Sequence, residues 1–354
     1  MKKSFLENKK NITFFVLFLT IVFLQISCGT NQRTVYSHTE LTSALKKNVV
    51  DSIRIPPYLR PGDTVAIIAS AGYVSNKNNY IGRADSLLRA WGLVPVHGKH
   101  LFAKHFQFAG TDRQRAEDLQ WALDEPSVKA IWEARGGYGS VRIVDRVNWE
   151  KFKKNPKWII GFSDITVLSI KGYSLGVASL HALMPISLTY PKPERQSAIV
   201  TLKNMLFGRK LKFVIPSDSL NIPGEAEGIV TGGNLSMLIS MLGSDLQLNT
   251  EGKILFLEDV GEYPYSYDRM LYAIARAGYF DKLAGLIVGD MSTKKENDPF
   301  GETVKEMILK HTRGKGYPVI FNFPAGHVVK NYTVPIGKWG KIKVKEKKTY
   351  IEFE

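Results

Sequence analysis

The sequence predicts an α/β protein with two domains, a doubly wound parallel sheet followed by a smaller mixed α/β domain. Three observations predict this architecture. Short apolar runs of strand length alternate with helically spaced segments in the first half of the chain. This pattern weakens after Pro185 and resumes near Gly228. With 354 residues, of which 44% are hydrophobic, the chain is also long enough for two globular domains.

The first domain is expected over residues 58–190, with four strands separated by helices. Apolar residues recur with helical spacing from Ile81 to Leu88 and from Ala116 to Leu123. The expected strands are Thr64–Ala69, Leu93–Val96, Val128–Ala134 and Trp158–Gly161. This alternation is typical of a flavodoxin-like parallel sheet, whose ligands bind at the carboxyl ends of the strands.

The second domain is expected over residues 228–354, after an inter-domain connection at 191–227 with prolines, charges and one short amphipathic segment. Its expected helices are Leu235–Leu242, Tyr267–Phe280 and Glu302–His311. Its expected strands are Lys253–Leu257, Leu283–Gly289 and Val319–Phe323, and the chain ends with a hairpin of Lys341–Val344 and Tyr350–Phe353.

The first residues of the chain are typical of a secretory signal. Four lysines precede an apolar stretch from Ile12 to Ile26, which is too short to span a bilayer comfortably. The small residue Ser27 follows that stretch. A basic segment, a short apolar core and a small residue are the parts of a signal peptide, so we expect one at residues 1–27.

A cysteine follows the expected signal directly. The segment Leu24–Cys28 resembles a bacterial lipobox, in which the cysteine is diacylated, although Gln25 is atypical at its position. We therefore expect lipidation of Cys28, a polar tether over residues 28–57, and an exported, membrane-anchored lipoprotein that faces the periplasm or the cell surface. An uncleaved anchor helix with an incidental thiol is the alternative.

The chain is strongly basic. It has 48 Lys and Arg residues against 33 Asp and Glu residues, and without residues 1–27 it would keep 44 and 32. Such a surface favours anionic surroundings, such as phospholipid head groups or cell-wall polymers. No nucleic-acid-binding motif is present and the basic residues are scattered, so no nucleic-acid partner is expected. Because Cys28 is the only cysteine, the chain can form no intrachain disulfide.

A serine follows the fourth expected strand at a predicted sharp turn. Helical spacing begins at Asp164, so Ser163 lies between a strand and a helix, where its hydroxyl would project above the sheet edge. Amides of the first helical turn point the same way and can stabilise an oxyanion. The stretch Gly161–Asp164 lacks the second glycine of the G-x-S-x-G form, and a plain helix N-cap serine is the alternative.

A glycine-rich loop, Arg135–Gly139, follows the third expected strand. Three of its five residues are glycines, which allow positive φ angles and close approach of backbone amides to a ligand. It therefore belongs to the same sheet edge as Ser163. A tight turn without a ligand is the alternative.

Two further side chains at strand ends suit catalysis. Glu258 ends one expected strand of the second domain, and His327 follows another. Singly, they could be a solvated acid and an ordinary polar histidine. With Ser163 they supply a nucleophile, a base and a group that orients the base, in the order Ser, Glu, His.

These stretches together resemble the LD-carboxypeptidase family of serine peptidases, which includes muropeptide LD-carboxypeptidases and microcin-immunity peptidases. The resemblance extends over about residues 58–345. Its motifs are short but occur in the expected order: Phe108–Asp112 with Arg115 and Asp118–Leu119, Arg135–Gly139, Gly161–Thr166, Gly232–Leu235, Leu257–Asp259, Tyr267–Leu271, and Gly326–His327 with Pro335–Gly337.

The resemblance implies roles for residues of this sequence. It implies Ser163 as nucleophile and Glu258 and His327 as its partners, with no metal and no organic cofactor. It places the oxyanion hole at the amides of Gly137 and Asp164. Substrate contacts are expected at Arg135, Gly136, Tyr138 and Asn234. The implied activity is release of terminal D-alanine from murein tetrapeptides at an L,D bond, and the resemblance allows a homodimer.

The sequence also departs from the family pattern. Many members have Ala-Pro-Ser where this chain has Ala69–Ala71, and His-Gly-Pro-Met where it has His181–Met184. An arginine of many members is replaced by Ser266. These changes concern loops around the pocket, so they affect the expected substrate more than the expected reaction. An amidase acting on other peptide conjugates and a non-catalytic lipoprotein that binds cell-wall peptides are the alternatives.

Overall fold

A computed structural model describes residues 53–75, 78–190 and 192–354. The expected signal peptide, Cys28 and most of the polar tether lie outside these residues. Within the described part of the chain, no helix is both long enough and apolar enough to cross a bilayer.

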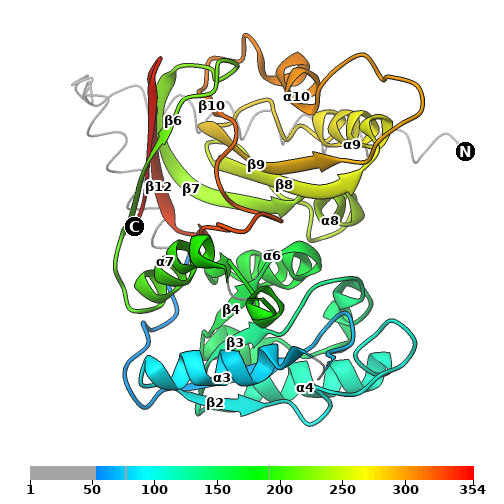
Figure 1. Cartoon of the computed structure of the whole chain (residues 1–354), viewed down its shortest axis with the longest axis vertical. Coiled ribbons are helices and arrows are strands. Elements are labelled where there is room, and N and C mark those ends of the chain that lie inside the picture. The colour runs from blue at the N-terminus through cyan, green and yellow to red at the C-terminus, as the bar shows by residue number, and fades with distance from the viewer. Residues whose placement is uncertain (1–52, 76–77, 191) are drawn as a thin grey trace, which may run out of the picture. The chain divides into compact units, whose positions relative to one another are not determined.

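The first sheet has six strands in the order β11-β5-β4-β3-β1-β2 (Figure 1). Five of them are parallel, and β11 pairs antiparallel with β5. The strands are β1 Thr64–Ile68, β2 Val94–His97, β3 Val128–Glu133, β4 Trp158–Gly161, β5 Ser179–His181 and β11 Val334–Ile336. The predicted parallel sheet of the first domain is thus confirmed.

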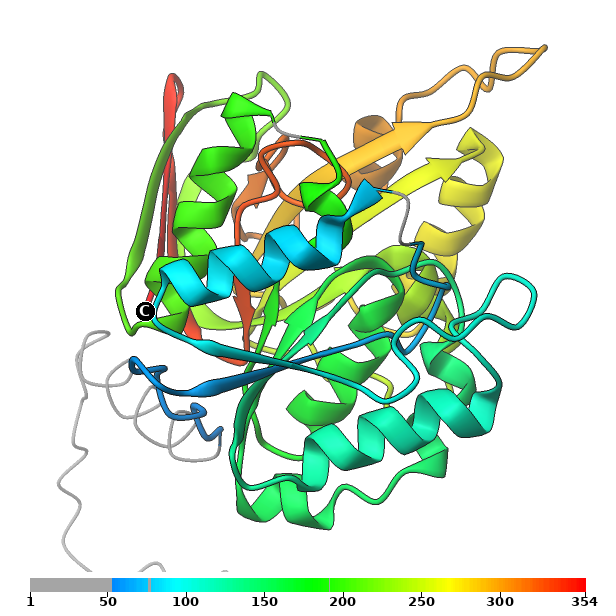
Figure 2. The same ribbon diagram turned by 60° about the horizontal axis from the view of Figure 1, so that its bottom comes forward.

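Helices cover this sheet on both faces. From β1 the chain runs to one edge strand, β2, and then returns across the sheet to β3, so right-handed crossovers place α3 and α4 on opposite faces. Figure 2 shows these two helices on either side of the strands. The helices of the first domain are α3 Tyr80–Ala90, α4 Asp112–Asp124, α5 Glu150–Lys154 and α6 Thr166–Ser174, with 3-10 turns at Ser140–Arg142, Val144–Arg146, Ser163–Ile165, Pro185–Leu188 and Pro193–Arg195.

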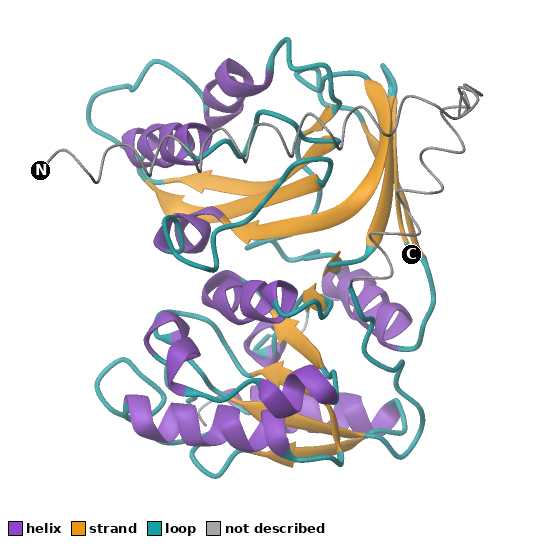
Figure 3. Cartoon of the chain, turned by 180° about the vertical axis from the view of Figure 1, so that it is seen from behind, coloured by secondary structure: helices purple, strands orange, loops and turns teal. Residues whose placement is uncertain are grey.

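The second sheet has seven strands in the order β10-β9-β8-β7-β12-β13-β6. Figure 3 shows the strands of both sheets in orange and the helices around them in purple. The strands β7 to β10 are parallel, whereas β12, β13 and β6 continue the sheet in antiparallel fashion. The strands are β6 Leu211–Pro216, β7 Gly224–Asn234, β8 Ile254–Glu262, β9 Gly285–Thr293, β10 Val319–Ile320, β12 Trp339–Val344 and β13 Lys348–Phe353. The helices are α7 Gln196–Leu206, α8 Leu235–Ser240, α9 Pro264–Arg276 and α10 Val304–Thr312. The mixed second domain and its terminal hairpin are therefore confirmed.

Three segments differ from the sequence-based expectation. The connection at 191–227 contains α7 and β6, and the alternating burial of β6 fits an edge strand paired with β13. Strand β11 lies in the second half of the chain but extends the first sheet. Strand β10 ends at Ile320 and does not reach Phe323, because Asn322 adopts a positive φ of 59°.

The carboxyl ends of β4 and β7 meet where the two sheets face each other. The amide of Asn234, at the end of β7, donates a hydrogen bond of 3.1 Å to the hydroxyl of Thr166, the first residue of α6. Gly233 has a φ of 146°, and a Cβ at this position would lie 2.7 Å from the Thr166 methyl group. A larger residue would separate the two sheet edges here, so this glycine brings both sets of strand ends into one site.

Candidate active site

Ser163 occupies a strained turn between β4 and α6. Its φ is 63°, one of four positive values among the described non-glycine residues. Such a conformation costs about 1–3 kcal/mol and persists only where the surroundings enforce it. The Ser163 hydroxyl forms no capping hydrogen bond, and neither the 3-10 turn nor α6 has a side-chain cap. The geometry therefore favours the nucleophile-elbow interpretation over the N-cap alternative.

His327, which is partly buried, forms a pair with the buried Glu258. The Nδ1 atom of His327 lies 2.8 Å from Oε2 of Glu258, whose side chain is fully buried. Burial raises the pKa of Glu258, and the hydrogen bond from His327 opposes that rise. Burial by itself would lower the pKa of His327, but the hydrogen bond and charge of Glu258, with Asp259 and Asp290, raise it above its ordinary value. A histidine held in this way can accept a proton at its free Nε2 atom.

A glycine allows this pair to form. Gly326 has a φ of 107°, and a Cβ there would lie 2.6 Å from Oε2 of Glu258. Its amide donates to Oδ1 of Asn331 at 2.8 Å, which holds the loop in place. The backbone before His327 thus lies directly on the carboxylate, and any other residue would push the two apart.

Asn234 supports Glu258 from the opposite side. Its Nδ2 group donates to Oε1 of Glu258 at 3.2 Å and to Oδ1 of Asp259 at 3.0 Å. Its Oδ1 atom accepts from the amide of Met237, so the side chain also caps α8. From the family resemblance, Asn234 was expected to contact substrate. In the structure this buried side chain is occupied by protein groups and positions the carboxylate of Glu258.

The glycine loop lies beside Ser163. A Cβ on Gly136 would be 3.2 Å from Cβ of Ser163 and 3.4 Å from its Oγ. The buried carboxylate of Asp164 accepts hydrogen bonds from the amides of Gly139 at 3.3 Å and Ser140 at 2.8 Å. Asp164 was predicted for its amide alone, and the structure adds that its side chain ties the loop to the nucleophile turn.

Arg135 and Tyr138 lie at the two ends of this loop. The Arg135 guanidinium donates to the carbonyl oxygens of Gly136 and Tyr73, and no ion pair of Arg135 occurs within the described residues. The Tyr138 side chain is 47% exposed, and its ring lies 6.1 Å from that of Phe108. Both side chains are therefore available to a ligand that enters beside Ser163.

A second histidine lies close to His327. The ring of Phe162 lies 4.9 Å from that of His327 and 5.7 Å from that of His181. The rings of His181 and Phe256 lie 4.8 Å apart, and the buried Nε2 atom of His181 has no hydrogen-bond partner among the residues that the structure describes. Burial, with a smaller contribution from His327, lowers the pKa of His181 to about 3, so this ring stays neutral. The sequence indicated only that His181 belongs to a loop near the pocket.

Sequence reasoning missed Glu133, a buried acid at the end of β3. Its carboxylate accepts hydrogen bonds from the amide of Ser70 at 2.9 Å and from its hydroxyl at 2.7 Å. Burial raises the pKa of Glu133 to about 8 against these bonds. Ser70 is one of the departures from the family pattern, and its partnership with Glu133 gives that departure a physical reason. Across residues 53–75, 78–190 and 192–354, no group of three His, Cys, Asp or Glu side chains could hold a metal ion.

Comparison with known proteins gives consistent results. Family models described as the LD-carboxypeptidase N-terminal and C-terminal domains match residues 65–182 and 227–342. A Bacillus subtilis protein named "probable murein peptide carboxypeptidase" is 33% identical over 84% of this chain and 94% of its own length.

Two solved structures have the same fold. The muramoyltetrapeptide carboxypeptidase of Oxalobacter formigenes is 26% identical, with a TM-score of 0.74 over 82% of this chain and 98% of its own. The microcin C7 self-immunity protein is 22% identical, with a TM-score of 0.74 over 84% of this chain and 98% of its own. At 22% identity, the similarity to the self-immunity protein shows a shared fold alone.

Proposed function

The chain belongs to the LD-carboxypeptidase family, and we propose that it is a serine carboxypeptidase that removes terminal D-alanine from murein tetrapeptides at an L,D bond. The observation that carries the proposal is the pair of His327 and the buried Glu258 at 2.8 Å, next to a strained serine turn. The names of the Bacillus subtilis and Oxalobacter formigenes proteins support the choice of substrate.

Ser163, His327 and Glu258 have distinct roles in the proposed reaction. The Ser163 hydroxyl attacks the carbonyl carbon before D-alanine while Nε2 of His327 takes its proton. Glu258 accepts the Nδ1–H of His327, which fixes the tautomer and stabilises the imidazolium. His327 then returns the proton to the departing amine, and water hydrolyses the acyl-enzyme. The Ser163 hydroxyl forms no hydrogen bond to His327 within the described residues, and catalytic contacts of this kind often tighten only when substrate binds.

The glycine loop would stabilise the oxyanion. Amides of Asp164 and Gly137 are the proposed donors, because Asp164 follows the nucleophile and the loop backbone passes beside Ser163. Removal of one such donor in other enzymes lowers kcat by about 10²- to 10³-fold. The Asp164 side chain would keep the loop amides in place as charge develops.

A carboxypeptidase must also bind the terminal carboxylate of its substrate. Arg135 suits this role, since its guanidinium has no carboxylate partner among the described residues and lies in the loop beside Ser163. Gly136 leaves room for the peptide, and Tyr138 offers an exposed aromatic side chain next to it.

We further propose that the enzyme is exported and anchored through lipid on Cys28. The support is the basic segment, the short apolar stretch and the lipobox-like Leu24–Cys28. The substrate would then be cell-wall peptides or their released fragments outside the cytoplasm. The family resemblance also allows a homodimer. Light scattering of the purified protein, which measures its molar mass, tests this possibility.

Incubation of the purified protein with muropeptide tripeptides, tetrapeptides and pentapeptides, read by mass, tests the proposed activity. Tetrapeptides should lose the mass of one alanine, and tripeptides should stay intact. If no tetrapeptide is shortened, the proposed activity is wrong. Cleavage of other peptide conjugates alone would favour the amidase alternative.

A further inference from the structure

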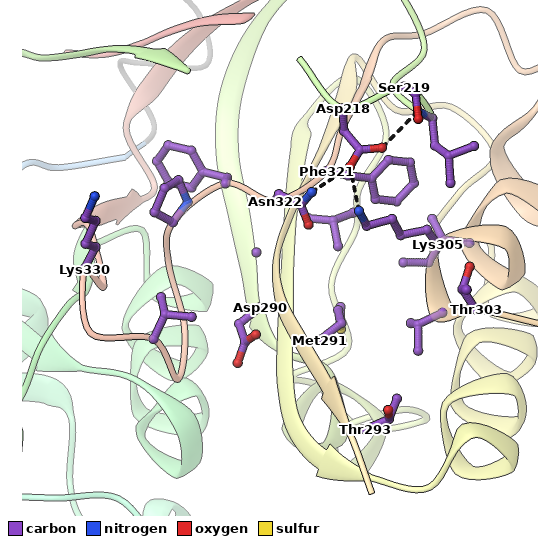
Figure 4. Close-up of a pocket in the computed structure, with 18 of the residues that line it drawn as sticks. Asp218, Ser219, Asp290, Met291, Thr293, Thr303, Lys305, Phe321, Asn322 and Lys330 are labelled. Atoms are coloured by element: carbon purple, nitrogen blue, oxygen red, sulfur yellow. Dashed lines mark hydrogen bonds and ion pairs between the residues drawn. The ribbon is translucent and has the colours of Figure 1, made fainter. Parts of the chain in front are cut away.

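A cavity of about 890 Å³ adjoins the loop that carries His327. It lies between the end of β9, the start of α10 and the segment after β10 (Figure 4). Pro324 on one side of His327 and Val328 to Lys330 on the other side line it. Its size is that of a ligand pocket, because such pockets usually measure about 300–1,000 Å³.

Two of the four acidic residues that line this cavity form ion pairs. Asp218 pairs with Lys305 at 2.6 Å and accepts from Asn322 at 2.6 Å, as Figure 4 shows. Glu302 pairs with Lys310. Glu194 is exposed to solvent. Asp290 is different, because no cation pairs with it within the described residues and it is partly buried.

Asp290 lies between the cavity and the catalytic pair. It follows the buried strand residues of β9, and its amide donates to the carbonyl of Ala325, two residues before His327, at 2.9 Å. Burial raises its pKa, against the charge of His327 and a hydrogen bond from the amide of Met291. Lys330 lines the same cavity, but Figure 4 draws the two side chains apart with no contact between them.

We propose that Asp290 binds the side-chain ammonium group of the substrate's diamino acid, and that the cavity accommodates that side chain. The inference rests on the proposed function. In a murein tetrapeptide the diamino acid supplies the carbonyl that Ser163 would attack, so its side chain begins beside His327. From there it needs to reach only the adjoining cavity, where no cation of the described residues pairs with Asp290.

The chemistry of the Asp290 carboxylate favours an ammonium ligand. A carboxylate that burial has partly stripped of water gains most from a charged donor that replaces this water. A hydrogen bond to a charged group contributes enough to change kcat/KM by about 10- to 100-fold. Apolar lining residues of the cavity, among them Val288, Met291 and Val328, suit the methylene groups of such a side chain.

Two tetrapeptides that differ only at the third residue, lysine or norleucine, test the inference. Norleucine keeps the methylene chain and lacks the ammonium group. The purified full chain should cleave the lysine peptide with a kcat/KM about 10- to 100-fold higher. Asp290→Asn should remove this preference, so that the ratio of kcat/KM for the lysine peptide to that for the norleucine peptide falls to about one. Glu251→Gln, a matched loss of an acid that pairs with Lys282 outside this cavity, should keep the wild-type ratio.

The outcomes separate the two proposals. If the wild type cleaves neither peptide, the proposed function is wrong and the inference falls with it. If the wild type cleaves both peptides equally, only the inference is wrong. If Asp290→Asn slows both peptides by the same factor, Asp290 acts on His327 through its charge, and ammonium recognition is refuted. Thermal unfolding of the Asp290→Asn protein shows whether a loss of activity comes from misfolding.

Discussion

The Nδ1 atom of His327 lies 2.8 Å from Oε2 of Glu258, although 69 residues separate them in the sequence. Two other residues hold this contact: Gly326 lets the backbone lie on the carboxylate, and Asn234 donates to its other oxygen. The pair is therefore built from Glu258 within β8 and from the loop after β10, with support from Asn234 at the end of β7. This arrangement makes several outcomes predictable.

Ser163→Ala should abolish peptidase activity and leave the fold intact. Loss of the nucleophile in such a triad lowers kcat by about 10⁶-fold, whereas loss of the acid lowers it by about 10⁴-fold. Glu258→Gln should therefore keep measurable turnover when D-alanine release is followed by mass. Equal activity of the wild type and Ser163→Ala would refute the serine mechanism.

Activity should depend on pH through His327. The imidazole must be neutral to accept the proton of Ser163. Burial alone would lower the pKa of His327, but Glu258 raises it above the ordinary 6.5. The kcat/KM should therefore fall as the pH drops through a midpoint above 6.5. In Glu258→Gln the charge of Glu258 is lost, so the effect of burial on the pKa of His327 would dominate. The midpoint of the pH profile should therefore move to lower pH. An identical pH profile for both proteins would contradict this role of Glu258.

Gly326→Ala should damage catalysis more than stability. The new Cβ would lie 2.6 Å from the Glu258 carboxylate at a φ of 107°, so the Glu258–His327 pair must shift. Displacement of a catalytic group by about 1 Å can cost on the order of 10²-fold in rate. Steady-state kinetics and thermal unfolding measure the two effects.

Gly301→Ala is the matched control for that variant. Gly301 has a φ of 90°, but a Cβ there would meet no atom within 4 Å. Both variants carry the conformational cost of a positive φ, which is about 1–3 kcal/mol. Only Gly326→Ala should lose activity, and equal kinetics of the two variants would argue against the packing of Gly326 on Glu258.

Cys28 should be lipidated in cells. Each buried methylene contributes about 0.8 kcal/mol to membrane binding, so two acyl chains anchor a protein stably. Cells labelled with a clickable palmitate analogue should yield a labelled wild type in the membrane fraction and an unlabelled Cys28→Ala variant. If the wild type stays unlabelled and in the cytoplasm, the proposed location and the proposed pool of substrate are both wrong.

Periodicity and turn residues were enough to predict the framework. The alternation of apolar runs and helical spacing predicted strands that correspond to β1, β3 and β4, and with them the parallel sheet. Because side chains at strand ends lie at the edge of a parallel sheet, the sequence also indicated which loops would carry Ser163 and His327. Glu258 was expected at a strand end, but it lies within β8, which continues to Glu262. These are local properties, since each depends on a few neighbouring residues.

The tertiary structure alone decided which residues that are distant in the sequence become partners. The order of strands brings β11 from the second half of the chain to the first sheet and makes β6 part of the second. Only this packing shows that Asn234 donates to Glu258, and that Asp290 lines a cavity beside the His327 loop with no ion pair to another described residue. A side chain's hydrogen-bond partner depends on which strand ends become neighbours. The sequence by itself therefore determined the candidate chemical groups, and the packing of the two sheets decided how they are paired.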